Sequence, residues 1–172
     1  METIYKAFGG KSGLVRHLRA RPDRRGPVPA YQRSDAMRAH ENDAKTIMRE
    51  WGVLTTEVAS VVTPIRLLMR SAAVTDSEMA ALLKDSDQER LTRMRHHARF
   101  LAELGYLRDG VTVAEATDVL WTCSSVEIYE LLVLQRGWSP QRFARFLAHF
   151  MIASLLPDSH SNDGLPDNAL DA

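Results

Sequence analysis

The opening residues of the chain carry side chains that suit contact with nucleic acid. Thr3, Tyr5 and Lys6 lie on one short predicted helix and offer hydroxyl, aromatic and cationic groups to base edges and phosphates. A Gly-Gly pair then interrupts the helix, and Lys11 falls in the first turn of the next one, where free backbone N–H groups already favour an anion. We expect Tyr5 and Lys11 to contact phosphates and Thr3 to lie nearest the bases.

Cations outnumber acids in this opening stretch, although the whole chain of 172 residues has a formal net charge of zero. The basic residues are Lys6, Lys11, Arg16, Arg19, Arg21, Arg24 and Arg25, and the acids among them are Glu2 and Asp23. Such a local excess suits a phosphate backbone. A solvated helix end followed by a linker would have the same charge pattern, so charge alone does not decide.

Side chains suited to catalysis or metal binding do not form a recognisable pattern. His96 and His97 are adjacent, and adjacent helical positions point about 100 degrees apart, so they do not converge on one metal ion. The chain lacks a Gly-x-Ser-x-Gly elbow, a phosphate-cradling loop and a His-Glu-x-x-His helix. Cys123 is the only cysteine, which excludes a disulfide framework and a thiolate metal cluster. We therefore expect no enzyme activity, no metal and no cofactor.

Composition places the chain among ordinary soluble globular proteins, with 45% hydrophobic and 26% charged residues. No apolar run approaches the ~20 residues needed to cross a bilayer, and the N-terminus lacks the apolar core of a signal peptide. The sequence thus predicts a cytoplasmic protein that stays off the membrane.

Proline and glycine divide the chain into parts. The run RPDRRGPVPAY contains three prolines and a glycine, which break helices and predict a linker over residues 22–33. Residues 1–21 would then be a DNA-facing head and residues 34–156 the body of the protein. Residues 157–172 are polar and punctuated by Gly and Pro, so we expect a disordered tail.

The body is predicted to be helical throughout. Apolar residues recur at three- and four-residue steps from Ala44 to Val58, as in an amphipathic helix with one buried face. Gly52 lies within this helix and could let a neighbouring helix or a ligand come close. The pair Thr63-Pro64 is typical of a helix start and predicts a separate short helix that ends near Ala73.

Capping signals predict where the next helices begin. Thr75 or Asp76 should open a long helix that reaches Leu104, and Thr112 forms a capping box with Glu115 at the start of another.

The last two helices are rich in apolar residues. The helix from Val126 to Gln135 is apolar nearly all round, so it must be covered on more than one side. Ser139-Pro140 opens the last helix, which Pro157 stops. With no strand pattern anywhere, the sequence predicts an all-α helical bundle.

Two stretches resemble a known family. The spacing of Thr3, Tyr5, Phe8, Lys11 and Leu14 resembles the recognition helix and following helix of TetR/AcrR-family transcriptional regulators. Residues 113–156, with the runs DVLW, SVEIY and RGWSP, resemble the C-terminal half of actinobacterial TetR-like regulators. The resemblance implies a TetR-like ligand-binding and dimerisation body with a partial helix-turn-helix head. Two helices precede the recognition helix in that family, and Met1 falls about where the recognition helix should start. We therefore interpret the chain as cut within the helix-turn-helix by a misplaced start, a gene truncation or trimming.

The resemblance also implies a function. The chain would be a DNA-binding repressor that contacts a double-stranded operator, provided that its head is complete, and its body would bind a small, largely apolar effector. The candidate ligand-binding residues are Met48, Trp51, Thr55, Leu68, Met94, His97 and Trp121. Residues of these types are more often plain core residues than ligand contacts.

The family pairs its last two long helices with their copies in a second subunit, which implies a homodimer here. The candidate interface residues are Leu132, Phe143, Phe146, Leu147 and Phe150. Independently, they offer more apolar surface than one small bundle readily covers, although they could also pack inside a single subunit.

A second function remains open at the level of the sequence. A protein that has lost DNA binding could serve as a ligand-binding or dimerisation module that pairs with an intact regulator. The absence of the two front helices motivates this alternative.

Overall fold

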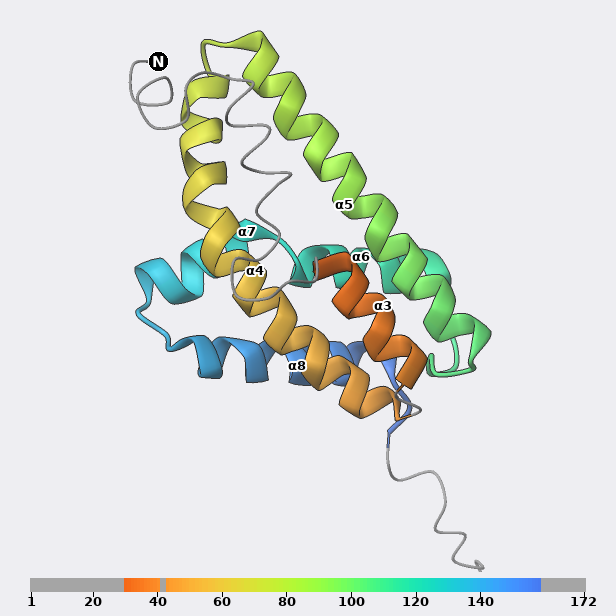
Figure 1. The fold of residues 1–172 in the computed structure, drawn as a ribbon. Coiled ribbons are helices and arrows are strands. Elements are labelled where there is room, and N and C mark those ends of the chain that lie inside the picture. Colours follow the sequence, from red (N-terminus) through yellow and green to blue (C-terminus); the bar gives the residue numbers. More distant parts are fainter. Residues whose placement is uncertain (1–29, 41–42, 159–172) are drawn as a thin grey trace, which may run out of the picture.

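The computed structural model describes residues 30–40 and 43–158, which form an all-α helical bundle (Figure 1). The predicted DNA-contacting residues Thr3, Tyr5, Lys6 and Lys11 lie outside the described residues, as do the whole predicted head and residues 159–172. The helices are α3 (Ala30–His40), α4 (Ala44–Ala73), α5 (Ser77–Glu103), α6 (Val113–Cys123), α7 (Val126–Tyr129), the π-helix η1 (Glu130–Gln135) and α8 (Pro140–Leu155). No strand occurs within these described ranges.

Helix α4 runs unbroken for 30 residues, so the predicted helix start at Thr63-Pro64 is wrong. Thr63 is completely buried and Pro64 lies inside the helix on an exposed face. An interior proline costs about 3 kcal/mol because it lacks the N–H that would bond to the preceding turn. Burial of Ile65 and Met69 against Met79 of α5 offsets this cost and carries the helix past the proline.

Helix α4 also contradicts the prediction that no apolar run approaches the length needed to cross a bilayer. Among the described residues, α4 is the one helix long and apolar enough to cross a membrane, with a mean hydropathy of 1.3 over its most apolar 18 residues. Length and composition are weak evidence for a span, since the core helix of a soluble protein meets the same criteria. The predicted helix start at Thr63 divides this apolar run into two shorter segments.

The predicted caps explain where the middle helices begin. Asp76 accepts hydrogen bonds from the backbone N–H groups of Glu78 and Met79 at 3.1 and 3.2 Å, so Asp76 rather than Thr75 caps α5. The capping box at the start of α6 is confirmed: Thr112 Oγ1 accepts from the Glu115 N–H at 3.2 Å, and Glu115 Oε2 accepts from the Thr112 N–H at 2.8 Å.

The C-terminal pair of helices follows the prediction with one difference. Residues 126–135 are helical, but the second part widens into the π-helix η1. Gly137 has φ +67°, a left-handed conformation that favours glycine, and ends the segment. Ser139 Oγ then caps α8 by accepting from the Arg142 N–H at 3.2 Å, with Pro140 in the first turn.

Helix α4 lies at the centre of the bundle, packed against α8 and α5 (Figure 1). Gly52 allows α4 and α8 to approach closely, because a Cβ at this position would lie 2.6 Å from the Ala144 carbonyl oxygen. Phe143 and Leu147 of α8 are fully buried in the same core.

Helix α3 begins at Ala30, within the predicted linker over residues 22–33. It lies beside α4 and α5 (Figure 1) and contributes little apolar surface. Polar contacts hold it instead: Arg33 pairs with Glu57 of α4 at 2.8 Å, and Ser34 bonds to His97 of α5. The linker prediction is therefore wrong for residues 30–33.

Candidate functional site

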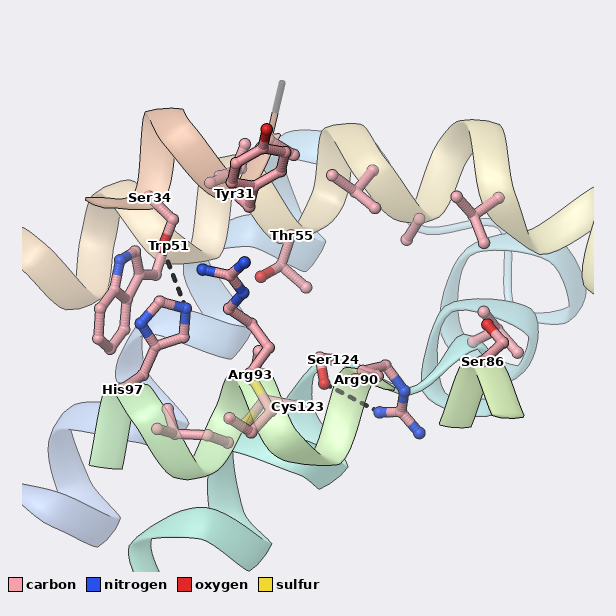
Figure 2. A pocket seen from close by; sticks show the side chains of 18 of the residues that line it. Tyr31, Ser34, Trp51, Thr55, Ser86, Arg90, Arg93, His97, Cys123 and Ser124 are labelled. Carbon is pink, nitrogen blue, oxygen red and sulfur yellow. Dashed lines mark hydrogen bonds between the residues drawn. The ribbon is translucent and has the colours of Figure 1, made fainter. Parts of the chain in front are cut away.

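The helices enclose a cavity of about 250 Å³ (Figure 2). One face of α4 supplies seven of its lining residues at three- and four-residue steps: Trp51, Leu54, Thr55, Val58, Ala59, Val62 and Arg66. Helix α5 faces it with Ser86, Arg90, Arg93, Met94 and His97. Ala30, Tyr31 and Ser34 of α3 form a further wall, and Leu120, Cys123, Ser124, Val126 and Met151 complete the lining. The site is thus a mostly apolar chamber with polar groups on α3 and α5.

His97 links α5 to α3 at one end of the cavity. The side chain is buried, its Nε2 lies 3.1 Å from Ser34 Oγ, and its ring lies 4.6 Å from that of Trp51 (Figure 2). Burial, followed by the nearby charges of Arg38 and Arg93, lowers the pKa of His97 to about 3. The imidazole is therefore neutral at physiological pH.

Two buried nitrogens at this end of the cavity have no hydrogen-bond partner among the described residues. They are Nδ1 of His97 and Nε1 of Trp51. A buried polar atom without a partner raises the free energy of the fold, so this end of the bundle keeps unused hydrogen-bonding capacity.

Cationic side chains are the strongest polar feature of the lining. Arg66, Arg90 and Arg93 face the cavity, and no aspartate or glutamate is among its lining residues. Asp87, just outside the lining, pairs through Oδ1 with Arg66 at 2.8 Å and Arg90 at 3.4 Å. The cavity walls are therefore positively charged.

Arg90 is held by several partners. Its Nη1 donates to the Trp121 carbonyl at 2.6 Å and to Ser124 Oγ at 2.9 Å, and its guanidinium lies over the Trp121 ring at 4.7 Å. Burial lowers the pKa of Arg90. The ordinary pKa of arginine lies so far above neutrality that the side chain still stays charged at physiological pH. Arg90 is thus a partly buried cation with several hydrogen-bond partners.

Four of the seven predicted ligand-binding residues line the cavity: Trp51, Thr55, Met94 and His97. The other three do not. Met48 is fully buried in the core, Leu68 is 39% exposed on the outside of α4, and Trp121 lies behind Arg90. These three were wrong because helical spacing indicates a face of a helix but not how deep each residue lies.

The sequence analysis missed the arginines and the α3 wall. A charged stretch such as that from Lys84 to Arg93 is typical of a solvated helix face, whereas Arg90 and Arg93 turn inward (Figure 2). Their three-residue spacing on α5 was a usable signal, since it places both on one side of the helix. Tyr31 carried no such signal because it lies in the stretch assigned to the linker, and Ser34 is the first residue of the predicted body, in a segment with little apolar periodicity.

Cys123 also lines the cavity, but as a small apolar group. Burial raises the pKa of its thiol to about 12, so it stays protonated and is a poor nucleophile. No cluster of three or more potential metal ligands occurs in the part of the chain that the structure describes.

The predicted interface residues fall into two groups. Phe143 and Leu147 have no exposed surface, so assigning them to the interface was wrong: they pack against α4 inside one subunit. Leu132 is partly buried against the same core. Phe146 and Phe150 remain exposed, at 36% and 43%, and their rings stack 6.2 Å apart.

Two more exposed leucines, missed from the sequence, accompany them in η1: Leu131 at 53% and Leu134 at 51%. We call Leu131, Leu134, Phe146 and Phe150 the C-terminal apolar surface. Each of these four side chains remains partly exposed within the described chain.

Comparison with known proteins gives no relative: no family model, no curated protein and no solved structure matches this chain. The site's own geometry and the sequence resemblance are what bear on its function.

Proposed function

We propose that this protein is a TetR-type DNA-binding transcriptional repressor whose helical body binds a small, largely apolar effector and dimerises. The observation that carries the proposal is the cavity of about 250 Å³ inside the bundle, whose lining surface is mainly apolar. Small-molecule sites are typically concave, mostly apolar and equipped with a few placed polar groups. A bundle built only for stability would fill such a space with side chains.

Helix α3 connects the cavity with the predicted DNA-binding head. This helix follows the predicted head along the chain and forms one wall of the cavity through Ala30, Tyr31 and Ser34. Of its side chains that the structure describes, only Ser34 is buried, so polar contacts rather than apolar packing fix its place. Helix α3 could therefore shift when the cavity is occupied, provided that the ligand compensates for the polar contacts that are lost.

Such a shift would act on DNA binding through the populations of two conformations. An effector that displaces Tyr31 or separates Ser34 from His97 favours a body in which the two heads no longer match successive major grooves. The unpartnered nitrogens of His97 and Trp51 lower the stability of the empty form, and an effector that satisfies them gains affinity.

Dimerisation is supported by the C-terminal apolar surface. Exposed aromatic and aliphatic side chains gathered on neighbouring helices are typical of protein interfaces, and closed symmetric dimers are the commonest assembly. A repressor that recognises an operator with two heads needs this pairing. The same role would place the protein in the cytoplasm.

The experiment is selection of double-stranded DNA from a random-sequence library by the full chain. We expect enrichment of a two-fold symmetric site, and we expect the joint replacement Thr3→Ala, Tyr5→Phe and Lys11→Ala to abolish the enrichment. If a dimer that binds hydrophobic compounds enriches no sequence, DNA binding by this chain is refuted. The chain would then be a ligand-binding or dimerisation module that pairs with an intact regulator.

A further inference from the structure

The charges around the cavity are not balanced. Four arginines face two aspartates, and each aspartate uses a single oxygen to contact two of them. Asp87 Oδ1 serves Arg66 and Arg90, while Asp35 Oδ1 serves Arg38 at 2.6 Å and Arg93 at 3.5 Å. Because the arginines outnumber the aspartates, positive charge remains available to an anionic ligand at a site whose other walls are apolar.

Arg93 is the least coordinated of the cavity arginines. Its contact with Asp35, at 3.5 Å, is long for a charge-assisted hydrogen bond, and the same oxygen lies much closer to Arg38. Its other contact is the face of the Tyr31 ring, 5.3 Å from the guanidinium carbon. Arg90, by comparison, donates to a carbonyl, a hydroxyl and a carboxylate. Arg93 thus keeps the most unused donors of the three cavity arginines.

A hydroxyl group lies beside this cation. Figure 2 shows the Arg93 guanidinium and the Thr55 side chain turned toward the same space, between Tyr31 and Ser34 of α3. Thr55 Oγ1 makes no hydrogen bond to another described residue. A guanidinium with free donors and an unpaired hydroxyl together form a recognition site for a carboxylate.

The surroundings limit what can be attached to that carboxylate. Beyond Thr55 the walls are aliphatic, with Val58 and Val62 of α4 opposite Leu120 and Val126. A cavity of about 250 Å³ has room for a hydrocarbon part of roughly eight carbon atoms at about 30 Å³ each, not counting a polar head that stays outside. Arg93 is 35% exposed, so a polar head bound there would lie near the mouth and the apolar part inside.

We propose that the effector is an amphipathic monocarboxylate, with its head on Arg93 and Thr55 and its hydrocarbon part along the aliphatic wall of α4. This proposal rests on the proposed effector site and specifies its ligand class. It also gives α3 a direct sensor, because a carboxylate on Arg93 competes with Asp35 and lies against Tyr31.

The test is calorimetric titration of the full chain with three ligands that share one chain length: decanoate, decanol and decylamine. We expect decanoate to bind at least about tenfold more tightly than decanol, as a charge-assisted hydrogen bond would provide. Decylamine should bind more weakly than decanol, because its ammonium would face Arg93.

Substitutions at Arg93 test whether this residue causes the preference for the carboxylate. Arg93→Gln should reduce the decanoate-to-decanol ratio to near one, while Arg93→Lys should keep part of it, since the charge remains. Arg95→Gln is the matched control, because Arg95 is exposed on the same helix and does not line the cavity. Thermal unfolding without ligand checks that each variant is folded.

Two results would overturn the inference. The first would leave the proposed function intact, and the second would also refute the proposed effector site. If decanol binds as tightly as decanoate, or if Arg93→Gln keeps the preference, the cavity binds apolar compounds without selecting an anion, and the proposed function stands. If none of the three ligands binds and a broad panel of hydrophobic compounds also fails, the effector site itself is refuted.

Discussion

His97 illustrates how one side chain can join the cavity to the helix that follows the predicted head. Its ring is packed on Trp51 and bonded to Ser34, and its protonation would place a charge in a buried position close to Arg38 and Arg93. The neutral imidazole therefore both closes one end of the cavity and fixes α3. At the scale of single residues, the site depends on keeping this histidine uncharged.

Acidification should weaken the fold through His97. The unfolded chain binds a proton on this histidine below about pH 6.5, whereas the folded chain does so only near pH 3, so the stability from the neutral form is present above 6.5 and lost as the pH falls. Between pH 7 and pH 5 we expect the free energy of unfolding to fall by about 2 kcal/mol from this group.

Urea unfolding followed by circular dichroism at several pH values measures the effect. His97→Asn should show a shallower pH dependence than the wild type, and His149→Asn, which alters an exposed histidine, should keep the wild-type slope. Equal slopes for His97→Asn and the wild type would show that His97 titrates normally in the fold.

At the scale of elements, α4 organises the protein. It packs against α8 on one side, lines the cavity with another face, and receives α3 through the Arg33–Glu57 pair. Its close contact with α8 depends on Gly52, because the two helices lie too close together at this position to leave room for a Cβ atom.

Gly52→Ala should therefore destabilise the protein although alanine is the better helix former. Alanine gains about 1 kcal/mol in helix propensity over glycine, but its Cβ would meet the Ala144 carbonyl and force α4 and α8 apart. We expect a net loss of about 1–3 kcal/mol in the free energy of unfolding, as for other overpacked sites.

Val53→Ala, at the neighbouring exposed position of the same helix, serves as the control and should change stability by less than about 0.5 kcal/mol. An unchanged or raised unfolding midpoint for Gly52→Ala would mean that the two helices can separate without cost.

The elements also show what the sequence could and could not predict. Caps at Thr112 and Ser139 were predictable because a side-chain hydrogen bond to a backbone N–H is a local interaction. Thr63-Pro64 misled because the burial that carries α4 through the proline comes from α5, which is distant in sequence. The start of helix α3 was missed because the helix has little apolar periodicity and is fixed by long-range polar contacts.

The cavity was predictable only in part for a similar reason. Apolar spacing identified the right face of α4, including Trp51 and Thr55, but depth is set by the packing of all the helices together. Arg90 and Arg93 looked like a solvated face because the carbonyl of Trp121 that binds Arg90 and the Asp35 that pairs with Arg93 belong to other helices, and these contacts exist only once the helices are in place.

At the scale of the whole molecule, the C-terminal apolar surface is the feature that a single subunit leaves uncovered. The buried half of α8 anchors it to α4, while its other half presents Phe146 and Phe150. Leu131 and Leu134 expose apolar side chains from η1. An assembly that covers these residues would bring two cavities and two α3 helices into one symmetric particle.

Light scattering should find a dimer at micromolar concentration, with twice the 19.3 kDa mass of one chain. Phe150→Glu should convert it to a monomer, because a buried unpaired carboxylate opposes association by several kcal/mol. Val74→Glu, at a position that is 84% exposed away from this surface, should remain dimeric. A wild-type monomer at that concentration would remove dimerisation from the proposed function.

The most direct test of the central claim is a fluorescence titration of the full chain with a broad panel of hydrophobic compounds, charged and neutral. Trp121→Phe and Trp138→Phe leave Trp51, which lines the cavity, as the only tryptophan. We expect at least one compound to give a saturable change with one site per subunit. Val62→Phe, which fills the cavity, should abolish the change, whereas Val53→Phe on the outer face of α4 should not. No saturable change with any compound, or binding that persists in Val62→Phe, would contradict the assignment of this cavity as an effector site.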